Sequence, residues 1–90
     1  MLLEDNKSIE KDINQLSQLI VKLRETKGLD EEFKKELILL YDSEISPWTK
    51  KYYLFNKETP KNEEDRMTEI IINMIITIAS LLNTNNGNQR

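Results

Sequence analysis

Apolar positions recur with helical periodicity over most of the chain. Between Asp5 or Ser8 and Lys27, five aliphatic residues fall at spacings of 4, 3, 4 and 3, which places them on one face of a helix. They are Ile9, Ile13, Leu16, Ile20 and Leu23. Gly28 follows as a C-terminal signal, because glycine adopts the left-handed conformation at little cost. The pattern predicts a first helix that ends near Lys27.

Two more helices are predicted in the middle of the chain. Asp30 is expected to be the N-cap of the second helix. Its inward residues are expected to be Phe33, Leu37, Leu40 and Tyr41. This helix should stop near Ile45, because Pro47 disfavours helical geometry at Ser46. Ser46 and Pro47 would then be the N-cap and first residue of a short third helix over residues 47–56.

The last third of the chain predicts a fourth helix. Residues 57–62 contain Pro60 and should form a loop, after which Asn62 and three acidic residues open a helix that runs to Leu82 or Asn83. Its polar positions step by 3, 4, 4 and 3 and form a single narrow stripe. They are Arg66, Glu69, Asn73, Thr77 and Ser80. A helix that is apolar on its other sides is typical of a central position with several neighbours.

These elements predict an all-α fold in a single domain. Residues 1–83 would form a four-helix arrangement (long, medium, short, long) around the central apolar fourth helix, and residues 84–90 a disordered polar tail. The isoleucines of the fourth helix exceed what three short neighbours can cover. We therefore expect a homodimer, through the fourth helix or through the apolar seam of the first.

Composition excludes many kinds of chemistry. The 90 residues include no cysteine and no histidine, which removes disulfides, thiolate nucleophiles, imidazole bases and the usual zinc sites. The serines have no activating group, and the acidic residues crowd first helical turns, where the helix dipole already accounts for them. We expect no enzyme activity, no catalytic residue, no metal site and no cofactor. With no signal peptide and no apolar run long enough to span a bilayer, a cytoplasmic location is expected.

One segment combines aromatic and basic residues. Four of the six aromatic residues fall between positions 48 and 55, and residues 46–61 carry a net charge of +3 in a chain of net charge −3. On a helix, Trp48, Tyr52 and Phe55 would share one face, with Tyr53 pointing elsewhere. Two interpretations stay open: the aromatic residues pack a short helix onto the bundle, or the segment recognises a partner. The candidate partner-binding residues are Trp48, Lys50, Lys51, Tyr52, Tyr53, Phe55 and Lys57.

The charge balance narrows the kind of partner. Four basic residues are a small footprint on an acidic protein, so nucleic acid is an unlikely ligand and a protein partner is preferred. A first alternative is an anionic small ligand such as a nucleotide, with its phosphates held by Lys50, Lys51 and Arg66. A second alternative is a structural assembly subunit.

The size, the acidic composition, the lack of cysteine and histidine, and the helical layout over residues 5–83 resemble the small four-helix immunity proteins that protect bacteriocin producers. No motif anchors this resemblance, so it carries over no functional residue. It implies a cytoplasmic, non-enzymatic protein that blocks, neutralises or sequesters a macromolecule, of immunity or anti-defence type. The excess of Ile, Lys and Asn favours a low-GC bacterium, or its plasmids or phages, as the source.

Overall fold

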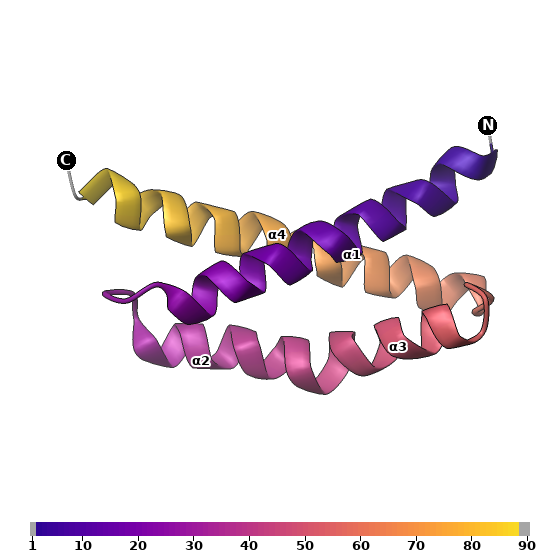
Figure 1. Cartoon of the computed structure of the whole chain (residues 1–90), viewed down its shortest axis with the longest axis horizontal. Helices are drawn as coiled ribbons and strands as arrows, with labels where there is room; N and C mark the ends of the chain where they lie inside the picture. The colour runs from indigo at the N-terminus through magenta and orange to yellow at the C-terminus, as the bar shows by residue number, and fades with distance from the viewer. Residues whose placement is uncertain (1, 89–90) are drawn as a thin grey trace.

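The computed structural model describes the backbone of residues 2–88 and the side chains of residues 9–83. This part of the chain is all-helical, as predicted (Figure 1). Its elements are α1 (Leu2–Glu25), α2 (Glu31–Leu40), the π-helical turn η1 (Tyr41–Ile45), α3 (Ser46–Leu54) and α4 (Lys61–Asn88). Because α2, η1 and α3 follow one another without a break, the described residues form three helical rods, and the expectation of four separate helices was wrong.

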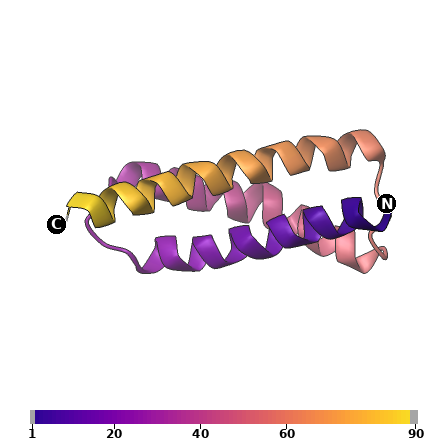
Figure 2. The same cartoon turned by 90° about the horizontal axis from the view of Figure 1, so that it is seen from above.

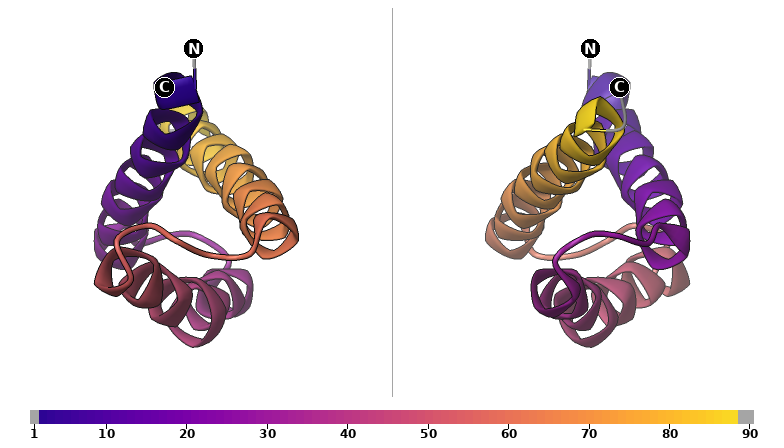
Figure 3. Two further views of the ribbon diagram at one scale, coloured as in Figure 1. Left: turned by 90° about the vertical axis from the view of Figure 1, so that its right-hand side faces the viewer. Right: turned by 90° about the vertical axis from the view of Figure 1, so that its left-hand side faces the viewer.

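The three rods enclose a triangular core. Seen along the long axis, α1 and α4 diverge from one corner and the α2–η1–α3 rod closes the base (Figure 3). From the side, α1 and α4 run in the same general direction and cross, while the third rod runs back beneath them (Figures 1 and 2). The molecule measures 44 × 27 × 18 Å, and α1 packs mainly against α4.

Pro47 lies inside the continuous rod, where the sequence had predicted a break. Ser46, the residue before it, keeps helical angles of φ −60° and ψ −45°, and its N–H donates to the carbonyl of Tyr41, five residues back. This π-turn is wider than an α-turn, which gives the proline ring room at a position that has no N–H to donate. The rod therefore bends at η1 instead of ending (Figure 1).

The core confirms the stripe predicted for the first helix. All five of its aliphatic residues are buried, and they meet residues from the other two rods. The buried residues of those rods are Leu37, Ile45, Trp48, Tyr52, Met67, Ile71, Met74 and Ile78. The structure describes no buried charged side chain within residues 9–83. The apolar face of α1 is thus used inside its own chain.

Helix α4 is not central, which corrects a second expectation. Only one of its faces is buried, and its polar stripe lies toward solvent as the spacing had indicated. Ile72 and Ile76, which a central helix would bury, are exposed. With three rods in place of four, α4 has one close neighbour and a second rod that approaches it less closely.

The N-terminal end of α2 and the chain segment before it follow the predicted signals. Gly28 adopts a positive φ of 88°, and the Asp30 side chain accepts hydrogen bonds from the backbone N–H groups of Glu32 and Phe33. The prediction of the inward face of α2 was only partly right, since Leu37 is buried and Tyr41 is half-buried. Phe33 and Leu40, however, are exposed, because the second rod meets α1 along a different line.

Several helix ends differ from their predicted positions. α1 ends at Glu25, before the predicted Lys27. α4 begins at Lys61 and its backbone continues to Asn88, so residues 84–88 extend the helix where an irregular tail was expected. Residues 89–90 of that tail lie outside the described part of the chain.

The burial pattern of α4 predicts unequal effects for two similar substitutions. Ile71 is 0% exposed and Ile76 is 62% exposed. Ile71→Ala should lower the free energy of unfolding by about 2–5 kcal/mol, because it leaves a cavity in the core. Ile76→Ala should change it by no more than about 0.5 kcal/mol. Urea denaturation followed by circular dichroism measures the free energy of unfolding of both variants. Equal losses of stability would contradict the described burial of Ile71 and exposure of Ile76.

Candidate functional site

The aromatic-basic segment divides between the core and the surface. Trp48 and Tyr52 lie in the core, with ring centroids 5.1 Å apart and planes 23° from parallel. Tyr53 packs edge-on against Tyr52 at a centroid distance of 5.2 Å and remains partly exposed. Phe55 was predicted to share a helix face with Trp48 and Tyr52, but α3 ends at Leu54, so Phe55 leaves the helical register and is exposed.

Tyr52 is buried in an environment that keeps its phenol neutral. Burial, together with the carboxylates of Glu64 and Glu10, raises the pKa of Tyr52 from 10.0 to about 12. Its hydroxyl group and the indole Nε1 of Trp48 are both buried without a hydrogen-bond partner among the described residues. These two side chains therefore support the fold and are not presented to a partner at the surface.

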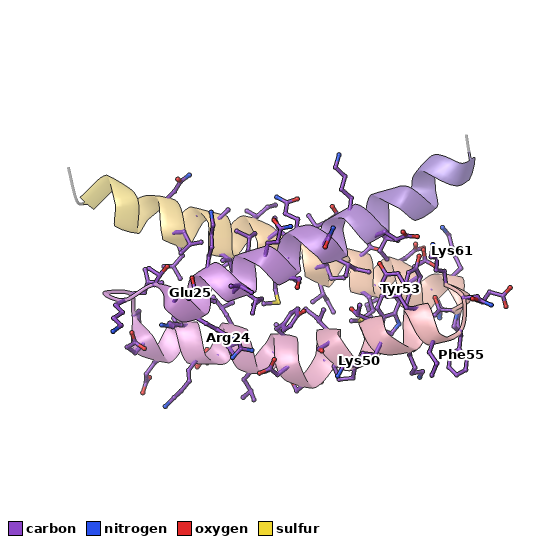
Figure 4. All side chains as sticks on the ribbon, viewed as in Figure 1. Arg24, Glu25, Lys50, Tyr53, Phe55 and Lys61 are labelled. Carbon is purple, nitrogen blue, oxygen red and sulfur yellow. The ribbon has the colours of Figure 1, made fainter. Side chains whose placement is uncertain are left out.

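The surface part of the segment is the C-terminal end of α3, which we call the tip. It consists of the exposed residues Lys50, Lys51, Tyr53, Leu54 and Phe55. Tyr53, Leu54 and Phe55 are 44%, 75% and 53% exposed. Leu54 follows Lys50 and Lys51 by one helical turn, so the two lysines flank it on the helix surface. Lys50 and Phe55 lie on the outer side of the rod (Figure 4).

A tight helix end holds the tip in place. The N–H of Asn56 donates to the carbonyl of Tyr53 at 3.2 Å, and the N–H of Lys57 donates to the carbonyl of Tyr52 at 2.6 Å. Together these bonds form a Schellman motif. Asn56 and Lys57 have positive φ angles of 56° and 66°. Such angles are unfavourable for residues other than glycine, so the surrounding contacts must fix them.

One of these contacts is an ion pair between Lys57 and α1. The Nζ atom of Lys57 lies 2.8 Å from a carboxylate oxygen of Glu10, and this bond raises the pKa of Lys57. Lys57, a predicted partner-binding residue, is thus engaged within the chain. Lys50 and Lys51 form no ion pair within residues 9–83, so their charges remain available.

Two of the three predicted anion-binding residues come together. Lys51 and Arg66 line one hollow of about 220 Å³ beside Trp48, whereas Lys50 does not line it. Glu44 and Glu63 line the same hollow. Their negative charges offset the two positive ones, so the lining has no net charge to attract a phosphate group.

A second exposed apolar surface, which sequence reasoning missed, lies between α2 and α4. We call it the groove: Phe33, Leu37 and Leu40 line it from α2, and Ile70, Met74 and Thr77 from α4, around a volume of about 300 Å³. A further hollow shares Phe33 and Thr77 with it and extends along α4 as far as Leu81. The sequence places Phe33 and Leu40 on one helix face but does not say that this face lacks a covering neighbour.

Acidic side chains border the groove on the α2 side. Glu36 lies one helical turn from Phe33 and from Leu40, and Glu32 lies one turn before Glu36. Neither glutamate forms an ion pair within residues 9–83. Lys35 lines a shallow hollow with the two glutamates and offsets part of their charge. On the α4 side Asn73 lines the groove, and the opposite charges of Arg66 and Glu69, one helical turn before Ile70 and Asn73, offset each other. The groove is therefore apolar with a weakly acidic rim.

No family model, curated protein or solved structure matches the chain. The resemblance to four-helix immunity proteins therefore stays an expectation. Among the residues that the structure describes, no cluster of three acidic side chains could hold a metal ion, and no helix combines the length and apolarity needed to cross a membrane.

The burial of Tyr52 predicts a loss of stability at alkaline pH. Between pH 10 and 12 the unfolded chain releases the phenolic proton while the folded chain keeps it, so the free energy of unfolding falls as pH rises through this range. The fall attributable to Tyr52 should be about 2 kcal/mol. Tyr52→Phe should remove this part of the fall. At neutral pH it should cost no more than about 1 kcal/mol, because the hydroxyl has no hydrogen-bond partner among the described residues.

Urea denaturation at several pH values measures both effects, with the ultraviolet absorption of tyrosinate as an independent record of ionisation. A Tyr52→Phe variant that loses stability as steeply as the wild type above pH 10 would contradict the described environment of the phenol.

Proposed function

We propose that the chain is a non-enzymatic binding protein that blocks, neutralises or sequesters a macromolecular partner, and that the tip is its recognition surface. The observation that carries the proposal is the exposure of three large apolar side chains at the end of α3, Tyr53, Leu54 and Phe55. They lie near Lys50 and Lys51, which form no ion pair within residues 9–83. Exposed apolar surface of this kind often marks an interaction site.

The arrangement of the tip favours tight binding. A few large side chains, often aromatic, contribute most of the binding energy at protein interfaces. The Schellman motif and the Lys57–Glu10 ion pair fix the backbone that carries them, so binding orders little additional chain. Lys50 and Lys51 add a positive border around Leu54.

The residues of the tip indicate what kind of partner surface it fits. A complementary partner presents an apolar hollow that receives Leu54 and Phe55, with acidic side chains around it to meet the lysines. A protein surface supplies this combination more readily than nucleic acid, which offers negative charge without an apolar hollow. The immunity or anti-defence role is part of this proposal.

Crosslinking from the tip tests the proposal. A photoreactive phenylalanine analogue in place of Leu54, in the cells that make the protein, should give a covalent adduct with one protein. The same analogue in place of Val21, which is exposed on α1 away from the tip, should not. With the purified partner, Leu54→Ser should weaken binding about tenfold or more, because a central anchor is lost.

Val21→Ser is the matched control and should leave affinity unchanged, since Val21 is 52% exposed and lies outside the tip. Identical adducts from both positions, or full affinity in the Leu54→Ser variant, would refute the assignment of the tip.

A further inference from the structure

The tip is complementary to an apolar hollow with an acidic rim, and the groove on the same chain is an apolar hollow with a weakly acidic rim. We infer that the groove of one copy takes up the tip of a second copy, so that the chain associates with itself head to tail. The inference concerns assembly and goes beyond the proposed function, although both use the tip.

Shape and apolar surface match between the two sites. The groove lies between two helices and exposes Phe33, at 40%, together with Leu40. The tip ends a helix and projects Leu54 and Phe55, the first of which is exposed more than any other large apolar side chain described. Insertion of the tip would remove both apolar surfaces from water in one step.

Charge is also complementary. Lys50 and Lys51 flank Leu54 on the tip, while Glu36 borders the groove and Glu32 lies one turn beyond it. None of the four forms an ion pair within residues 9–83. Lys35 reduces the negative charge of the rim without reversing it. Contact between two tips, or between two grooves, would place like charges together, so charge selects the pairing of unlike sites.

The tip cannot reach the groove of its own chain. α3 ends at one end of the long axis, beside Phe55, and α2 begins near the other end, in a molecule 44 Å long (Figures 1 and 4). A second copy must supply the tip. Such a heterologous contact closes if two antiparallel copies exchange tips, and propagates into a chain if they do not.

Sedimentation equilibrium on three forms of the full chain tests the inference. The wild type should show a mass that rises above the 10.7 kDa monomer with concentration, over a range of about 10–100 μM. Leu54→Asp puts a charge in place of the main apolar side chain of the tip, and Phe33→Asp does the same in the groove. Each variant alone should therefore stay monomeric. Mixed together they should form a heterodimer, because the first keeps an intact groove and the second an intact tip.

Two further variants guard against effects on folding. Val21→Asp, at an exposed position of α1 outside the tip and the groove, should associate like the wild type. Phe33→Ser removes the groove anchor without adding charge and should give the same result as Phe33→Asp. Every variant should keep the helical circular dichroism of the wild type.

The charge contribution is tested by reversal. A variant with both Lys50→Glu and Lys51→Glu should not associate. Mixing it with a second variant that carries Glu32→Lys and Glu36→Lys should restore association.

A wild type that stays at 10.7 kDa throughout this range overturns the inference. So does a mixture of Leu54→Asp and Phe33→Asp that fails to associate, or either variant associating alone. Phe33→Asp leaves the tip intact, so crosslinking from position 54 to a foreign protein would persist in it. Failure of self-association is thereby distinguished from failure of the proposed function.

Discussion

The arrangement of the whole chain depends on how the middle rod carries Pro47 without breaking. Because Ser46 bonds to Tyr41 across a π-turn, α2 and α3 remain one body with a bend between them. The extra residue in that turn keeps Ile45 and Trp48 on the inner side of the rod with Leu37. The bent rod forms one side of the core from Leu37 to Tyr52. α1 and α4 cross above it, and a groove remains where α2 and α4 separate.

Features set by neighbouring residues could be predicted from the sequence, whereas features set by packing partners could not. The stripe of α1, the Asp30 cap and the outward polar stripe of α4 follow from helical geometry alone. The rule that Pro47 ends a helix failed because it describes an α-turn, and tertiary contacts favoured a π-turn here. The sequence did contain a usable signal for the π-turn. Leu37, Tyr41 and Ile45 are four residues apart, and in a regular α-helix residues at this spacing drift away from one face.

The candidate site shows the same limit. Sequence correctly singled out the neighbourhood of residues 48–57, but adjacency along the chain could not separate core side chains from surface ones. Trp48 and Tyr52 are buried by the rods above them, and Phe55 is exposed because the helix stops one residue earlier. Leu54 escaped attention since a single leucine among aromatic residues carries no pattern. Phe33 and Leu40 were assigned to the core on the assumption that an apolar helix face always has a neighbour.

Exposed apolar surfaces carry a risk of indiscriminate association, and the charges beside them limit that risk. The tip has a positive border and the groove a weakly negative one. Two tips would therefore repel, and a tip in a groove would gain both apolar contact and charge neutralisation. Under the two proposals above, a copy of the chain and a foreign partner with an acidic rim would compete for the same tip. At low concentration the copies would separate by mass action and leave the tip free for the partner.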